Sequence, residues 1–295
     1  MVTFEPSDGR FFRVLAPQAE PELLACGFQF IEGPAWHPWG RFLVFSDILG
    51  DSLYTWSPSQ GTMLLRKPSH MANGNCYDLQ GRLITCEHAT SRVTRTEPDG
   101  SLCVMASHFE GRELNSPNDV VVSRDGAVYF TDPNSGRGTR FGVARRQELP
   151  FQGVFRLGPG EKLTLLVDDF SKPNGLCFSP SGERLFVDDT DRCHIRAFDV
   201  QANGRLTGGD VWAELPGEGV GVADGMKVDR NGNLYCTGPG GIHLFDSSGC
   251  HLGMVRMPEQ TANLAWGDED LCSLFITAST SLYRIRTLVP GMASF

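Results

Sequence analysis

A hairpin-like motif recurs six times along this 295-residue chain and constrains its fold more than any other feature. Each copy reads as an apolar stretch, a turn with a central glycine and a second apolar stretch, the pattern of a β-hairpin. The sixth copy, Leu264–Thr277, is degenerate, and the other five are marked by Gly40, Gly81, Gly126, Gly182 and Gly232. These glycines are 41, 45, 56 and 50 residues apart. Hairpin repeats of this period indicate the blades of a propeller.

Further strand-like runs follow the hairpins and give about four strands per repeat, as a propeller blade requires. The last repeat ends after Leu282–Arg286 and lacks an outer strand, whereas Glu22–Cys26 resembles the outer strands of the other repeats. We expect Glu22–Cys26 to pair with the last blade and close the ring, which leaves few exposed edges. The sequence therefore predicts an all-β fold, a single six-bladed β-propeller domain over residues 1–295. A β-sandwich or a flat repeat array is the alternative.

Charge and composition exclude several classes of partner. The 26 basic and 35 acidic residues give a net charge of −9, which argues against binding to nucleic acid or an anionic membrane. No apolar run is long enough to span a bilayer, and Met1–Arg13 lacks a secretory signal pattern. The nine cysteines are scattered without a CxxC pair, which predicts free thiols in a reducing cytoplasm. The sequence does not indicate the oligomeric state.

Oxygen-bearing side chains recur in phase with the repeat. Counting back eight residues from each turn glycine gives Glu32, Asn73, Asn118, Asn174 and Asp224. Equivalent positions in a propeller converge on one end of the central channel, so these oxygens should surround one small volume. Such a mixed amide and carboxylate set suits a hard divalent cation, Ca²⁺ before Mg²⁺ or Mn²⁺, with Zn²⁺ a further possibility. The sequence thus predicts a central metal site.

A second interpretation of these positions is that they are merely turns, because Asn-Gly and Asp-Gly are common turn dipeptides. That interpretation does not explain why an acid replaces the amide in two repeats. It also does not explain Asn118, which is followed by Asp119 rather than by glycine. In the sixth repeat the in-phase residue is Ala262, with Asn263 one residue later.

Four motifs around these positions resemble one known family. They are Glu32–Trp36 (EGPAW), Asn115–Asp119 (NSPND), Pro173–Leu176 with Phe178–Pro180, and Ala223–Met226 (ADGM). Together they are similar to the signatures of the senescence-marker-protein/gluconolactonase/luciferin-regenerating-enzyme family, from about Gly27 to Arg286. The resemblance implies a six-bladed propeller with one divalent ion in its channel. It also implies hydrolysis of a small-molecule sugar lactone, such as an aldonolactone, to its acid.

The resemblance also implies roles for individual residues. Glu32, Asn174 and Asp224 would bind the metal, and Asp224 would be catalytic. Asn118 would bind the substrate, the metal or a water molecule. Asp224 could act as a base or as a nucleophile, or a hydroxide on the ion could attack instead. Some animal lactonases carry an arginine at the position of Ser116, so sugar recognition by that arginine does not carry over.

Three further residues are candidates for substrate binding. Asn73 occupies the in-phase position of the second repeat, and Asn115 is the first residue of the NSPND motif. His88 follows a strand whose end is expected near the channel mouth. For His88 the alternative is a buried, hydrogen-bonded histidine with no contact to substrate. Trp36 and Trp266 are in phase on inner strands and are expected to be core residues.

An insertion in the third repeat is a possible lid. This loop, residues 133–153, contains Arg137, Arg140, Arg145 and Arg146, and a solvated basic loop without function is the alternative. Two other functions remain open. One is a phosphotriesterase-like hydrolase that uses the same metal centre, and the other is a non-catalytic, metal-stabilised binding propeller.

Overall fold

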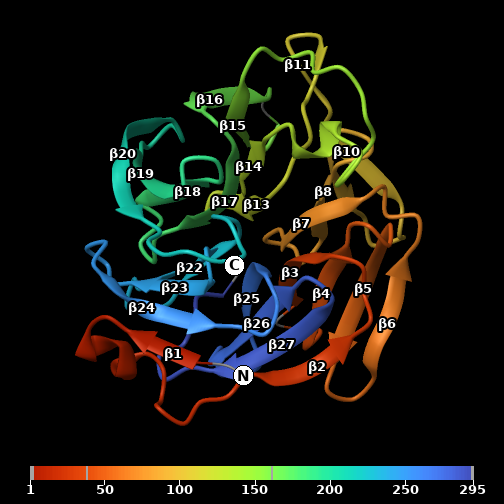
Figure 1. Ribbon diagram of the computed structural model, residues 1–295. Coiled ribbons are helices and arrows are strands. Elements are labelled where there is room, and N and C mark those ends of the chain that lie inside the picture. Colours follow the sequence, from red (N-terminus) through yellow and green to blue (C-terminus); the bar gives the residue numbers. More distant parts are fainter. Residues whose placement is uncertain (1–2, 38, 161, 294–295) are drawn as a thin grey trace.

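Six antiparallel sheets stand around a common axis in the computed structural model, like the blades of a propeller (Figure 1). The structure describes residues 3–37, 39–160 and 162–293. Within each blade the strands follow one another in sequence, and the first strand of each repeat lies nearest the axis. The predicted fold class, an all-β propeller with six blades, is confirmed.

The first three blades are formed by residues 31–170. Blade one contains β3 (Ile31–His37), β4 (Phe42–Asp47), β5 (Ser52–Ser57) and β6 (Gly61–Arg66). Blade two contains β7 (Ala72–Tyr77), β8 (Leu83–Glu87), β9 (Arg92–Thr96) and β10 (Leu102–Ala106). Blade three contains β13 (Val120–Val122), β14 (Val128–Asp132), β15 (Gln152–Leu157) and β16 (Thr164–Phe170). A two-stranded ribbon, β11 (His108–Phe109) and β12 (Arg112–Glu113), precedes blade three, and the 3₁₀ turn η2 (Ser135–Arg137) lies in its insertion.

The other three blades complete the circle. Blade four contains β17 (Pro173–Phe178), β18 (Arg184–Asp189), β19 (His194–Val200) and β20 (Leu206–Glu214). Blade five contains β21 (Met226–Val228), β22 (Leu234–Gly238), β23 (Gly241–Phe245) and β24 (His251–Arg256). Blade six contains β25 (Thr261–Gly267), β26 (Ser273–Ala278) and β27 (Ser281–Arg286).

The N-terminal segment adds a strand to each of the last two blades. β2 (Glu22–Cys26) pairs antiparallel with β27, so blade six combines both ends of the chain. β1 (Thr3–Pro6) pairs with β24 and makes blade five five-stranded, which the repeat pattern does not predict. Between these strands, the 3₁₀ helix η1 (Gly9–Arg13) buries Phe11 against blade five. Both additions cover strand edges that would otherwise be open.

The hydrophobic core lies between neighbouring blades. In the contact between blades six and one, the Trp36 ring stacks on Phe275 with centroids 5.3 Å apart and planes 14° apart. Trp266 is also buried, and its indole N–H donates to the carbonyl of Val228 over 2.7 Å. Both tryptophans are therefore core residues, as expected. All nine cysteines are free thiols. No helix in the described part of the chain is long and apolar enough to cross a membrane.

Candidate functional site

Inner strands break their regular pairing at the positions that the repeat singles out. The register shifts between Glu32 and Ala35 in β3, between Ala72 and Asn75 in β7, and between Pro173 and Leu176 in β17. Such bulges bend a strand and redirect its side chains. The shifts therefore occur where the predicted ligands Glu32 and Asn174 leave the sheet.

The glycine that follows the predicted residue makes room for the next blade. A Cβ atom on Gly33 would lie 2.0 Å from the carbonyl oxygen of Asn73, and one on Gly175 would lie 2.0 Å from that of Asp224. Neighbouring inner strands thus approach too closely for a larger residue. The interpretation of the Asn-Gly pairs as turns is wrong, since Asn73 and Asn174 lie within β7 and β17.

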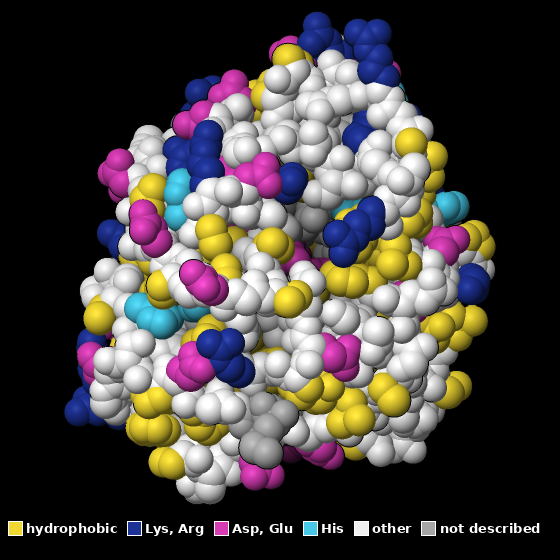
Figure 2. All heavy atoms as spheres, in the orientation of Figure 1, with side chains coloured by type: hydrophobic (Ala, Val, Ile, Leu, Met, Phe, Trp, Pro, Cys, Tyr) yellow, Lys and Arg dark blue, Asp and Glu magenta, His cyan; other side chains and the backbone are white. Residues whose placement is uncertain are grey.

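The approach of the blades brings Glu32, Asn174 and Asp224 together. The carboxyl groups of Glu32 and Asp224 are hydrogen-bonded to each other. Asn174 donates from Nδ2 to the hydroxyl of Thr190 over 3.0 Å. That hydroxyl donates to the carbonyl of Ala223, directly before Asp224, over 2.7 Å. Three blades thus contribute to one cluster, and Figure 2 shows acidic side chains inside the hollow near the centre of this face.

The acids of this cluster are hard to ionise together. Burial, and then the charge of Asp119, raises the pKa of Glu32 to about 7. Burial and the neighbouring Glu32 raise the pKa of Asp224 well above its usual value. Lys227, three residues further along the chain, opposes this effect because its charge lowers the pKa of both Glu32 and Asp119. A bound divalent cation would relieve the remaining repulsion.

Donor chemistry at this site fits a hard cation. The amide oxygens of Asn73 and Asn174 are buried without a hydrogen-bond partner, as is one carboxylate oxygen of Asp119. Such orphaned oxygens are costly unless a ligand satisfies them. The described residues contain no group of three or more His, Cys, Asp or Glu placed to hold a metal. The predicted set is different, since it combines two carboxylates with an amide, the donors that Ca²⁺ prefers.

His88 acts on the site through Asn73. Its Nδ1 lies 2.8 Å from the carbonyl oxygen of Phe141, so Nδ1 carries the proton and donates it. Its Nε2 then accepts from Nδ2 of Asn73 over 3.1 Å, which turns the amide oxygen of Asn73 away from the histidine. Burial lowers the pKa of His88 to about 4, so the ring is neutral near pH 7. Both ring nitrogens of His88 therefore have partners within the protein.

Asn115 is engaged in holding the backbone of blade three. It is fully buried, and its Nδ2 donates to the carbonyls of Asp132 and Phe151 over 3.0 and 2.9 Å. Its Oδ1 has no partner. Asn118 lies against the inner strand of blade two, because the amide N–H of Gly74 donates to its carbonyl over 2.8 Å. The structure thus places Asn118 beside blade two, whereas the side chain of Asn115 is bonded to the backbone of blade three.

Three carboxylates hold the chain just before a predicted site residue. Each ends the second strand of its blade, is buried, and accepts two backbone N–H groups from the positions two and three residues before the site residue. These are Asp47 with Gln29 and Phe30 (3.1 and 2.9 Å), Asp132 with Asn115 and Ser116 (2.8 Å each), and Asp189 with Ser171 and Lys172 (2.8 and 3.1 Å). Such charge-assisted bonds fix the backbone that carries Glu32, Asn118 and Asn174.

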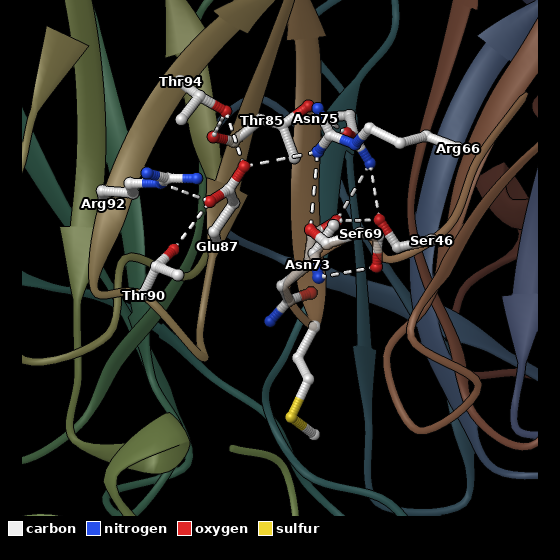
Figure 3. Close-up of polar contacts among 12 residues, drawn as sticks. Ser46, Arg66, Ser69, Asn73, Asn75, Thr85, Glu87, Thr90, Arg92 and Thr94 are labelled. Carbon is white, nitrogen blue, oxygen red and sulfur yellow. Dashed lines mark hydrogen bonds and ion pairs between the residues drawn. The ribbon is translucent and has the colours of Figure 1, made fainter. Parts of the chain in front are cut away.

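Blade two uses its carboxylate differently. Glu87 ends β8, and its side chain accepts from Thr90 (2.6 Å), Arg92 (2.6 Å) and Thr94 (3.0 Å) rather than from the incoming loop. Figure 3 shows these three side chains gathered around the Glu87 carboxylate. The loop before Asn73 is held by Asp51 instead, which accepts the N–H of Met71 over 2.8 Å.

Three residues of the site were not predicted from the sequence. Asn263 donates from Nδ2 to Glu32 over 3.0 Å and also hydrogen-bonds to Asp119. Asp119 and Lys227 contribute to the charge pattern described above. The signals were present but weak: Asn263 is shifted by one residue from the repeat position, and Asp119 replaces the glycine found in other repeats.

Fold and site together define a propeller with acidic side chains in the hollow at the centre of one face, hereafter the pocket (Figure 2). The family described as SMP-30/Gluconolactonase/LRE-like region matches residues 30–280, and the chain belongs to this family. It is 32% identical to a gluconolactonase of Zymomonas mobilis, with 92% of this chain and 82% of that protein covered. It is 28% identical to a pentonolactonase of Haloferax volcanii, with 84% and 81% covered.

Solved structures agree with this assignment. A gluconolactonase of Xanthomonas campestris superposes with a TM-score of 0.90 and 33% identity over 97% of this chain and 95% of that one. A calcium-binding regucalcin of Agrobacterium tumefaciens superposes with a TM-score of 0.78 over 93% and 96% of the two chains. At 20% identity, the second likeness supports the fold alone.

Proposed function

We propose that this protein hydrolyses sugar lactones with the help of one divalent cation, Ca²⁺ first among the candidates. The observation that carries the proposal is the hydrogen-bonded pair of carboxyl groups, Glu32 and Asp224, in one cluster with Asn174, whose amide oxygen is buried without a partner. The relatives described above support the substrate class, because those that share a third of the sequence are gluconolactonases. The substrate would be a small-molecule aldonolactone and the product its acid. We expect the protein to act in the cytoplasm.

The residues present fit such a cation. Glu32, Asn174 and Asp224 would hold it, and the two carboxylates would balance its charge. When bound, a dication polarises the lactone carbonyl and stabilises the negative charge that develops on its oxygen. No other step is required of it.

The chain's own residues would do the rest of the work. Asp224 would take the proton from the attacking water, because its carboxyl group lies in the cluster beside Glu32. Asn118 and the free oxygen of Asn73 would orient the lactone, with His88 holding the Asn73 amide in place. The carboxylate of Asp132 would fix the backbone that leads to Asn118.

A lactone panel assayed with metal-stripped protein tests the proposal. We expect acid release from gluconolactone or xylonolactone above the spontaneous rate only after Ca²⁺ or another divalent ion is added back. The Asp224→Asn variant should lose at least 100-fold in kcat while remaining folded. Asp229→Asn is the matched control, because Asp229 is a buried carboxylate at the other end of β21. Full activity of the stripped protein, or of Asp224→Asn, would contradict the proposal.

A further inference from the structure

The loop over residues 133–153 reaches from blade three to the first two blades. The carbonyl oxygen of Phe141 accepts a hydrogen bond from His88 of blade two over 2.8 Å. The Phe141 ring packs against Phe30 of blade one, with centroids 4.9 Å apart. Phe30 lies two residues before Glu32, and His88 contacts Asn73. The tip of the loop is therefore beside the proposed pocket.

Two of the four arginines in this loop serve its own structure. Arg137 is buried and donates from Nε to the carbonyl of Asn115 over 2.6 Å and from Nη1 to Glu113 over 2.9 Å. Arg145 donates from Nη2 to the carbonyl of His88 over 3.0 Å. These bonds attach the loop to blades two and three and hold it in place.

Ser116 also belongs to this attachment. Its hydroxyl donates to the carbonyl of Pro133 over 2.5 Å and accepts the N–H of Gly136 over 2.9 Å. Both capacities of the hydroxyl are used within the protein. The hydroxyl of Ser116 is therefore not available to a ligand.

Arg140 differs from the structural arginines. It is exposed, and its guanidinium carbon lies 4.8 Å from the centroid of the Phe141 ring. Among the described residues, no carboxylate lies within ion-pair distance of it and no hydrogen bond involves its side chain. Stacking on an aromatic face orients a guanidinium and leaves its in-plane N–H groups free to donate. In Figure 2, basic side chains flank the central hollow.

We propose that Arg140 determines specificity by donating hydrogen bonds to the hydroxyl groups of the sugar lactone. The proposal rests on the proposed function and deepens it. The guanidinium of Arg140 lies over the ring of Phe141, whose carbonyl is hydrogen-bonded to His88. His88 in turn hydrogen-bonds to Asn73, so this chain of contacts joins Arg140 to the site. A planar donor fork suits the adjacent hydroxyls of an aldonolactone. Arg140 lies at the rim and takes no part in the proton transfer assigned to Asp224.

Steady-state kinetics on glucono-δ-lactone at saturating Ca²⁺ test this proposal. For Arg140→Met we expect KM to rise at least tenfold, the usual effect of losing a hydrogen bond from a charged donor, with kcat within twofold of the wild type. Arg146→Met is the matched control. It lies on the same loop, is exposed, and has no side-chain partner among the residues that the structure describes. Its KM should not change.

Two further measurements separate recognition from a structural role. The melting temperature and the Ca²⁺ affinity of Arg140→Met should equal those of the wild type. A KM within twofold of the wild type would overturn the proposal, as would a lower kcat accompanied by weaker Ca²⁺ binding. If the wild-type protein itself hydrolysed no lactone, the proposed function would be wrong, which is a distinct result.

Discussion

Asn263 of the last blade donates a hydrogen bond over 3.0 Å to the carboxylate of Glu32 in the first blade. This bond favours the ionised form of Glu32, which burial otherwise opposes. In Asn263→Ala the carboxyl group of Glu32 would hold its proton more tightly and would therefore bind a cation less tightly. We expect the Kd for Ca²⁺, measured by calorimetry at pH 7, to rise about tenfold.

The control for this variant is Asn233→Ala. Asn233 also donates from Nδ2 to a buried carboxylate, that of Asp229, over 2.7 Å, but in the hairpin turn of blade five. It should lose stability without losing Ca²⁺ affinity. Equal Kd values for Asn263→Ala and the wild type would show that Glu32 does not bind the ion.

Gly175 is expected to tolerate no side chain. An added Cβ would lie 2.0 Å from the carbonyl oxygen of Asp224 and 2.9 Å from a carboxylate oxygen of Asp188. Gly175→Ala should therefore destabilise the protein by about 1–3 kcal/mol and lower kcat/KM by displacing Asp224. Urea unfolding and kinetics measure the two effects. Gly9→Ala, where nothing lies within 4 Å, should change neither.

Protonation of His88 should lower the stability of the folded protein in acid. Burial lowers its pKa from 6.5 to about 4, so the unfolded chain gains a proton between these pH values before the folded chain does. The stability present above pH 6.5 is thus lost as the pH falls towards 4. In His88→Gln, the free energy of unfolding should fall less steeply over this range, as urea titrations would show.

His243 provides a matched comparison for His88. Burial also lowers its pKa to about 4, but it lies in blade five against His251 and the carbonyl of Pro239. His243→Gln should flatten the same pH dependence without affecting KM. Only His88→Gln should raise KM for the lactone, because Asn73 and Phe141 lose their shared partner. Equal KM values for the two variants would refute the positioning role.

Thiol reactivity should follow the blade structure. Cys26, Cys103 and Cys250 are exposed, whereas Cys76, Cys86, Cys177 and Cys236 are buried. Burial raises the pKa of Cys177 to about 12, so the buried thiols are both inaccessible and un-ionised. A colorimetric thiol titration should detect the exposed group within minutes and the buried group only after denaturation. Fast reaction of all thiols in the native protein would contradict the packing.

Local sequence was enough for the architecture and for the in-phase residues. A glycine turn between two apolar runs encodes a hairpin wherever it occurs, and six copies leave a ring as the favoured way to bury their faces. The segment Glu22–Cys26 was predicted with the same bounds as β2 for the same reason. β1 (Thr3–Pro6) was not predicted, because its sequence contains no copy of the repeat.

The period, and with it the set of residues that share a position in each blade, can therefore be read from the amino-acid sequence. Which of their neighbours act on the site depends on contacts between blades. Asn263, Asp119 and Lys227 act on Glu32 across blade boundaries, and the loop from blade three holds His88, which hydrogen-bonds to Asn73. Contacts of this kind depend on distances across the channel. The repeat period does not encode those distances, because residues far apart in the sequence meet only when the blades pack together.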